Sequence, residues 1–233
     1  MGKKYAVYSA TRNIYEIMLP SVKSLLTNSD VDKIFLLIED DTFPFYLPKC
    51  VETINVSGQT YFPMDGPNAN CMWTYMVLIR AAYCYIFEGI DKILSLDIDT
   101  IVEKDISGIW NYDISDYYLA GVREPKKSKD FLYVNMGVTM HNLAKLRDGK
   151  ANQIINILNM QKWAFPEQDV FNLYCAGHIF ELPPEYNCSI CTQPATQSWI
   201  KHYAALPMEK WTKAPEYKNY KTMEWREVLR GRK

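Results

Sequence analysis

Runs of apolar residues separated by polar turns predict a series of strands along this chain. The runs at 33–38 (KIFLLI) and 92–96 (KILSL) are apolar almost throughout, which is typical of strands buried on both faces of a sheet. Further strands are predicted at 4–9, 117–122 and 134–140, with a shorter one at 54–56.

Apolar residues at helical spacing predict helices between these strands. Asn13 can cap a helix over 14–26, and a long helix carrying Arg80 is predicted over 72–87. Two more helices are expected at 153–160 and 168–174. Strand and helix alternate, so we predict an α/β fold with a mostly parallel central sheet covered by helices on both faces. We expect one domain over 1–209 and a tail over 210–233.

The composition is that of a globular protein. The chain has 233 residues, of which 48% are hydrophobic, enough for a large core and too many for a disordered or collagen-like chain. The 26 Lys and Arg residues balance 27 Asp and Glu residues, which gives no reason to expect a nucleic-acid partner. The opening residues do not resemble a signal peptide, and no apolar stretch is long enough to span a membrane, so a soluble, cytoplasmic protein is expected.

The six cysteines are expected to be reduced thiols in such a protein. Cys175, His178, Cys188 and Cys191 have the residue types and spacing of a zinc site. However, His178 opens the apolar run HIFEL, which is typical of a buried strand. We therefore favour ordinary core packing over zinc binding for this group.

Two aspartates follow the predicted strand at 92–96. Asp97 and Asp99 would lie side by side at the carboxyl edge of a parallel sheet, the edge at which open α/β sheets bind ligands. Two such carboxylates repel each other unless a cation neutralises them, and their oxygens suit Mg²⁺ or Mn²⁺. The alternative is a pair of turn and capping residues, because Asp is favoured where strands end. The residues alone leave both interpretations open.

Two enzyme classes place Asp-x-Asp after a strand. In haloacid-dehalogenase-type phosphohydrolases it follows the first strand, and an acidic pair comes late in the chain. Here the motif is in the middle of the chain, and the compact acidic cluster at 39–41 lies before it. Nucleotide-sugar glycosyltransferases, in which the motif follows a nucleotide-binding half, fit this order better.

Several ordered stretches between about residues 4 and 211 also resemble the motifs of one family. They are ATRNIY (10–15), Arg80, DKILSLDIDTIV (91–102), VNMGV (134–138), PEQDVFN (166–172), LPPEYN (182–187) and HYAA (202–205). The chain resembles the family 8 retaining glycosyltransferases, a group that includes glycogenin, bacterial lipopolysaccharide galactosyl- and glucosyltransferases, and galactinol synthase. Because the matches are spaced and occur in the right order, chance is a poor explanation.

The resemblance implies a GT-A fold, in which a single Rossmann-like domain binds a UDP-sugar and Mn²⁺, or Mg²⁺ in its place. It implies transfer of glucose or galactose, with retention of configuration, to a hydroxyl of a carbohydrate, lipid-linked or protein acceptor. Asp97, Asp99 and His202 would be the metal ligands, and Glu167 and Gln168 the catalytic residues. The resemblance implies UDP contacts from Ala10, Thr11, Asn13, Tyr15, Arg80, Asp97, Ile98, Asp99 and Lys210, and donor-sugar contacts from Asn135, Gly137, Glu167 and Gln168.

The chain departs from the family pattern at several of these positions. Glu167 replaces the usual Asp, Met136 replaces Ser, and Ala205 replaces Gly. Lys210 comes two residues later than the family's lysine. These departures motivate an alternative function, a catalytically inactive relative that still binds a UDP-sugar.

The tail over 210–233 differs from the rest of the chain. It carries eight basic and three acidic residues, with Trp211, Tyr217, Tyr220 and Trp225 among them. This mixture suits peripheral contact with an anionic membrane surface, where a lipid-linked acceptor would lie. A partly helical tail that packs on the domain is the alternative, and we favour it.

Overall fold

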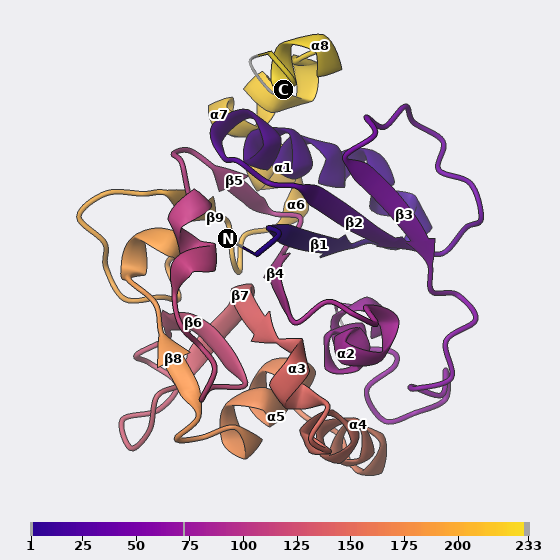
Figure 1. The fold of residues 1–233 in the computed structure, drawn as a ribbon, viewed down its shortest axis with the longest axis vertical. Helices are drawn as coiled ribbons and strands as arrows, with labels where there is room; N and C mark the ends of the chain where they lie inside the picture. Colours follow the sequence, from indigo (N-terminus) through magenta and orange to yellow (C-terminus); the bar gives the residue numbers. More distant parts are fainter. Residues whose placement is uncertain (1, 72, 231–233) are drawn as a thin grey trace.

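A seven-stranded sheet forms the centre of the computed structural model, which describes residues 2–71 and 73–230 (Figure 1). The strand order is β3-β2-β1-β4-β7-β6-β8. These strands are β1 (Tyr5–Ser9), β2 (Lys33–Ile38), β3 (Val51–Asn55), β4 (Lys92–Leu96), β6 (Leu119–Arg123), β7 (Val134–Asn142) and β8 (Ile179–Glu181).

The sheet changes direction at β7. Strands β3, β2, β1 and β4 are parallel, whereas β7 runs antiparallel to both β4 and β6. The backbone N–H of Asp97, just beyond β4, donates to the carbonyl of Gly137 in β7 at 2.8 Å. The residues after β4 therefore lie where the parallel half meets the antiparallel strand.

Beyond β4 the chain enters a second sheet, which has two strands. Strand β5 (Thr100–Val102) pairs antiparallel with β9 (Ile200–His202), and Thr100 lies opposite His202. This pairing joins residues about a hundred positions apart in the sequence and brings His202 next to the end of β4.

Helices cover both faces of the main sheet (Figure 1). On one face α1 (Tyr15–Asn28) packs through Met18, Val22 and Leu25. The other face is covered by η2 (Tyr75–Ala82), α2 (Tyr83–Ile86), α3 (Leu143–Leu146), α4 (Lys150–Met160) and α5 (Pro166–Tyr174). The remaining short helices are η1 (Arg12–Ile14), η3 (Ser107–Asn111), η4 (Pro184–Tyr186), α6 (Met208–Trp211), α7 (Pro215–Thr222) and α8 (Trp225–Val228).

These elements confirm the predicted α/β class and its mostly parallel sheet. The strand predicted at 54–56 is the end of the longer β3, and the strand predicted at 117–122 is β6, which begins two residues later. The continuous helix predicted over 72–87 is wrong. The segment is a 3₁₀ helix up to Ala82 and an α-helix only from Tyr83, and Met72 lies outside the described residues. The chain enters it through Thr74, whose φ is 65°, and packing on both α4 and α5 outweighs the local periodicity.

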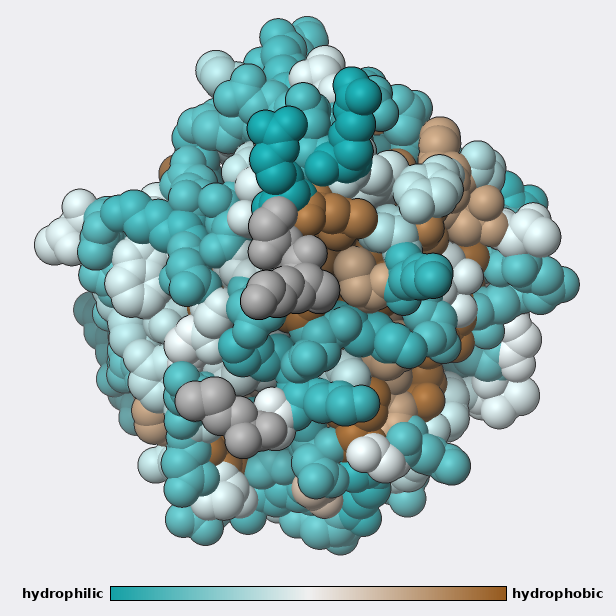
Figure 2. Space-filling view, turned by 45° about the horizontal axis from the view of Figure 1, so that its top comes forward, coloured by the Kyte–Doolittle hydropathy of each residue, from teal (hydrophilic) through white to brown (hydrophobic). Residues whose placement is uncertain are grey.

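The described part of the tail packs on α1. Tyr217 donates to the carbonyl of Ile17 in α1 at 3.3 Å, the ammonium of Lys23 donates to the carbonyl of Met223 at 2.7 Å, and Asn28 donates to the hydroxyl of Tyr220 at 2.7 Å. Trp211 and Tyr217 are buried in one cluster with Ile101 and Tyr203. The packed arrangement favoured from the sequence is therefore the observed one. The face that carries these helices is mostly hydrophilic (Figure 2). No helix in the described ranges combines the length and the apolar character needed to cross a bilayer.

Candidate active site

Asp97, Asp99 and His202 meet at the carboxyl end of β4. One ligand atom from each lies within 4.8 Å of the others. Nε2 of His202 is 3.3 Å from Oδ1 of Asp99 and 3.8 Å from Oδ2 of Asp97. The hydroxyl of Thr100 donates to the carbonyl of Asp97 at 2.7 Å and so tightens the turn between the two aspartates. The structure brings together the three residues that the sequence predicted as metal ligands.

The donor set fits a divalent cation. Two carboxylate oxygens and one imidazole nitrogen match the ligand preferences of Mn²⁺. Burial alone would raise the pKa of Asp99, but the adjacent imidazole of His202 lowers it. Burial alone would lower the pKa of His202, and Asp99 and Asp97 outweigh burial and raise it. Each group thus favours the charged form of the other, and a cation at the imidazole nitrogen would take the place of a proton.

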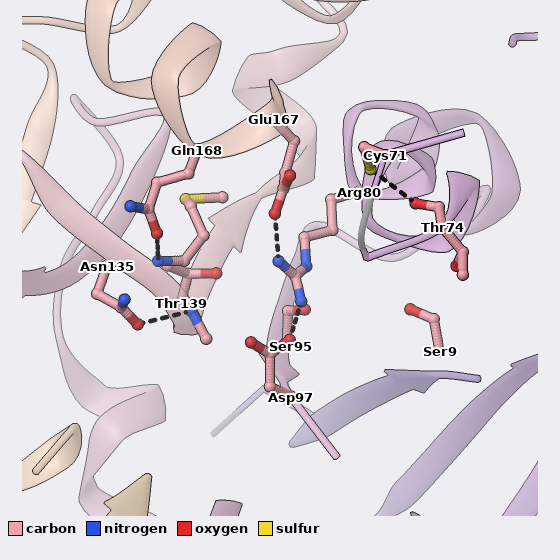
Figure 3. Close-up of polar contacts among 12 residues, drawn as sticks. Ser9, Cys71, Thr74, Arg80, Ser95, Asp97, Asn135, Thr139, Glu167 and Gln168 are labelled. Carbon is pink, nitrogen blue, oxygen red and sulfur yellow. Dashed lines mark hydrogen bonds and ion pairs between the residues drawn. The ribbon is translucent and has the colours of Figure 1, made fainter. Parts of the chain in front are cut away.

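Arg80 connects this cluster to α5. Its guanidinium is buried, forms an ion pair with Asp97, and donates to Oε1 of Glu167 at 2.7 Å (Figure 3). Burial raises the pKa of Glu167 to about 7, even though Arg80 beside it favours the carboxylate. Positive charge is therefore fixed between the candidate metal ligands and Glu167.

Gln168 and Asn135 lie next to this pair and share one acidic partner. The amide nitrogen of Gln168 donates to Oε2 of Glu124 at 3.1 Å, and that of Asn135 donates to the same oxygen at 3.2 Å. The backbone N–H of Met136 donates to Oε1 of Gln168 at 3.0 Å (Figure 3). Sequence reasoning missed Glu124, because the predicted strand ends at Val122 and only the observed β6, which continues to Arg123, places Glu124 directly after a strand.

Gly137 lies against the imidazole. A Cβ atom at this position would be 2.1 Å from Cε1 of His202. The predicted sugar-binding glycine therefore makes room for a metal-ligand candidate in this structure.

The residues predicted to hold uracil and ribose follow β1, which pairs with β4: Ala10 and Thr11 lie in the loop, Asn13 in η1, and Tyr15 at the start of α1. The hydroxyl of Thr11 donates to Oδ1 of Asn13 at 2.7 Å. Tyr15 is buried, and its hydroxyl donates to Asp40 at 2.9 Å and accepts from the N–H of Glu39 at 2.6 Å. Tyr15 thus joins the start of α1 to the loop after β2. Ala10 is buried and its N–H donates to the carbonyl of Leu37 at 3.1 Å.

The other predicted contacts are more scattered. Ile98 packs partly against the core, and Lys210 is exposed on α6. Among the cysteines weighed for zinc, Cys175 is buried, whereas Cys188 and Cys191 are half-buried. The run after His178 forms the predicted strand, β8, but the prediction that this strand is buried is wrong, because Ile179 is its only buried residue and His178 itself is exposed.

Solved structures with the same architecture are GT-A glycosyltransferases. The glycosyltransferase GlyE of Streptococcus pneumoniae aligns with a TM-score of 0.74 and 18% identity over 99% of this chain and 63% of its own. The galactosyltransferase LgtC, solved with donor and acceptor sugar analogues, aligns with a TM-score of 0.72 and 17% identity over 97% of this chain and 99% of its own. The chain therefore spans less than two thirds of GlyE but nearly all of LgtC. At these identities the likeness shows the fold.

The sequence itself shows the family. The model of "Glycosyl transferase family 8" matches residues 8–210, and the chain belongs to this family. A lipopolysaccharide 1,2-glucosyltransferase of Escherichia coli K12 is 27% identical over 255 aligned positions, which cover 92% of this chain and 75% of the relative. A putative glycosyltransferase of Haemophilus influenzae is 28% identical over 115 positions, covering 43% of this chain and 35% of the relative. Membership of this family removes the phosphohydrolase alternative.

Proposed function

We propose that this protein transfers a hexose, glucose or galactose, from a UDP-sugar to a hydroxyl acceptor with retention of anomeric configuration. The observation that carries the proposal is the cluster of Asp97, Asp99 and His202 beside the buried guanidinium of Arg80. This cluster offers cation ligands and fixed positive charge at the sheet edge where a nucleotide diphosphate would bind.

Asp97, Asp99 and His202 would hold Mn²⁺, or Mg²⁺ in its place. When bound, such a cation neutralises negative charge on a diphosphate leaving group. Arg80 adds a second, permanent positive charge at the same place, held by its ion pairs with Asp97 and Glu167. The loop that contains Ala10, Thr11 and Asn13 would contact the uracil and ribose.

The sugar would lie between the cation ligands and the start of α5. Glu167, Gln168 and Asn135 offer hydrogen-bonding groups there that can replace the water lost by the sugar hydroxyls. In the transfer, the bond from the anomeric carbon to the UDP oxygen breaks. A bond to the acceptor oxygen forms, and the acceptor proton goes to the departing phosphate. Glu167 and Gln168 are the residues that we propose to contact the reacting carbon.

We propose a glycan or lipid-linked glycan as the acceptor. The support is the relative from Escherichia coli K12, whose name gives lipopolysaccharide as its substrate and of which this chain spans 75%. A protein acceptor is the alternative. The proposal assigns no membrane contact to the basic tail, because its residues Trp211 and Tyr217 are buried in a cluster with Ile101 and Tyr203.

A screen of UDP-sugars for Mn²⁺-dependent hydrolysis tests the proposal. We expect UDP-glucose or UDP-galactose to be hydrolysed, and Asp97→Asn to abolish turnover. Asp91→Asn is the matched control, because Asp91 precedes β4 at its opposite end and is exposed. UDP binding without turnover of any donor, with glycan acceptors present, would instead support the inactive relative. If the protein shows no UDP binding and no turnover, both the active and the inactive alternatives are refuted.

A further inference from the structure

The second ring nitrogen of His202 has a buried partner. Nδ1 lies 2.8 Å from Oδ1 of Asn187, while Nε2 faces Asp99 and Asp97. Asn187 is fully buried, and its backbone is held by Pro184, which accepts from its N–H, and by Thr192, which donates to its carbonyl. The Asn187 side chain is therefore a fixed partner for the imidazole.

The orientation of this amide follows from a backbone group further along the chain of contacts. The N–H of Gly137 donates to Oδ1 of Asn135 at 3.0 Å. A backbone N–H can only donate, so the Asn135 atom at this place has to be the oxygen. Nδ2 of Asn187 donates to the same oxygen at 3.0 Å. The oxygen of Asn187 is thus the atom that faces His202, and because it only accepts, Nδ1 of His202 carries a proton.

The hydrogen bonds around Glu124 agree with these donor and acceptor assignments. The amide nitrogen of Asn135 donates to Glu124, a carboxylate that accepts. Gln168 donates to the same carboxylate, and its own oxygen accepts from the N–H of Met136. The backbone amides of two adjacent residues, Met136 and Gly137, thus fix the direction of both side-chain amides, and no contact in the network opposes it.

Gly137 restricts the imidazole from a second side. Its Cα lies so close to His202 that a Cβ would be 2.1 Å from Cε1. The ring is therefore held by a hydrogen bond at Nδ1 and by backbone contact at Cε1, which leaves Nε2 directed at the two aspartates.

We infer that Asn187 is a positioning residue for His202. It keeps the proton of the neutral imidazole on Nδ1, so that the lone pair of Nε2 is presented to a divalent cation. The Gly137 N–H determines which ring nitrogen is protonated, because it fixes the orientation of the Asn135 amide, and Asn135 in turn fixes that of Asn187. Partners of this kind typically change metal affinity by about 10- to 100-fold when removed. The inference rests on the proposed metal site, but the tautomer can be measured without metal.

The first test is the tautomer in the unmodified protein. The chain has three histidines, so ¹⁵N-edited NMR of the metal-free protein at alkaline pH resolves their ring nitrogens, with His202→Gln giving the assignment. We expect a protonated Nδ1 and an unprotonated Nε2 for His202. A proton on Nε2 with a free Nδ1 would overturn the inference, and this result needs no folded variant.

The second test compares variants by Mn²⁺ titration of the purified protein. We expect Asn187→Ala to mix the two tautomers and to weaken Mn²⁺ binding by about tenfold or more. Asn187→Asp keeps an accepting oxygen toward Nδ1, so it should preserve the protonated Nδ1, whereas the lost donation from Nδ2 to Asn135 should lower stability. Asn172→Ala is the control: Asn172 is equally buried, but its side chain bonds to backbone groups of Val134 and Gln168 and not to His202, so it should lower stability without changing Mn²⁺ affinity.

The outcomes separate the two proposals. If folded Asn187→Ala keeps the wild-type tautomer and Mn²⁺ affinity, Asn187 has no positioning role. If the wild-type protein binds no Mn²⁺, the metal centre in the proposed function is wrong, and the NMR spectrum still decides whether Asn187 sets the tautomer.

Discussion

Arg80 and Glu167 form a buried ion pair in which Nη1 donates to Oε1 at 2.7 Å. The same guanidinium is paired with Asp97, so a single cation serves one candidate metal ligand and one candidate sugar-binding residue. Because Arg80 lies in η2 and Glu167 in α5, the pair also joins the 3₁₀ segment to the helix that begins beside the site.

Arg80→Ala should be strongly destabilising. It would leave Glu167 buried without its partner, and breaking a buried pair from one side typically costs about 3–5 kcal/mol. Arg123→Ala is the matched control, because the Arg123–Glu181 pair is partly exposed and surface pairs contribute up to about 1 kcal/mol. Urea unfolding of both variants measures the difference. Equal costs would show that the Arg80 pair is no more important than a surface contact.

Ala205→Gly should stabilise the fold. Ala205 has a φ of 63°, in the left-handed region that costs a residue with a Cβ about 1–2 kcal/mol. Glycine adopts this φ without strain but loses about 0.5–1 kcal/mol through the greater freedom of the unfolded chain. The net expectation is a small gain in the free energy of unfolding, measured by urea or thermal denaturation.

Ala204→Gly provides the control for that substitution. Ala204 directly precedes Ala205 but does not have a positive φ, so glycine at 204 should only add flexibility to the unfolded chain and lower stability. If both glycine variants are destabilised alike, the backbone at Ala205 is not strained.

The sequence predicted most of the main sheet because its strands are locally distinctive. The runs at 33–38 and 92–96 are apolar almost throughout, and they form β2 and β4 with the predicted bounds. The two-stranded sheet was not predicted. Each of its strands has three residues, and their pairing joins Thr100 to His202, a long-range contact that no local pattern specifies.

The same limit applies to the site: residues next to a predicted strand could be placed from the sequence, and residues positioned by long-range contacts could not. Asp97 and Asp99 directly follow a strand, so their position at the sheet edge could be derived from the residues alone. His202 was found only through the family resemblance. The roles of Glu124 and Asn187 depend on hydrogen bonds between distant segments, which become visible only once β6, β7 and η4 are assembled.

Mn²⁺ binding should weaken as the pH falls. Burial lowers the pKa of His202, but the carboxylates of Asp99 and Asp97 outweigh it and raise the pKa above 6.5. In the metal-free fold this imidazolium contributes stability below pH 6.5, which is lost as the pH rises through the raised pKa. A cation competes with the same proton, so its affinity and the stabilisation it gives should both increase as the pH rises from 6.5 through the raised pKa of His202.

Titration calorimetry and thermal denaturation with and without Mn²⁺ measure this dependence. His202→Gln should bind Mn²⁺ weakly and with a flatter pH profile. His178→Gln, at an exposed histidine, should behave as the wild type. A wild-type affinity that is constant over this pH range would argue against His202 as a ligand.

Gly137→Ala should remove Mn²⁺ binding, whereas Gly121→Ala should affect stability alone. A methyl group at 137 would be 2.1 Å from Cε1 of His202, so the ring has to leave its place beside the aspartates. At Gly121, in the neighbouring strand, a Cβ would be 3.0 Å from the side chain of Val134, far from the imidazole contact. Overpacking of this kind typically costs about 1–3 kcal/mol. We therefore expect both variants to unfold at lower urea concentration, but only Gly137→Ala to lose Mn²⁺ affinity in direct titration. Equal Mn²⁺ affinities in the two folded variants would mean that the position of the His202 ring does not control the metal site.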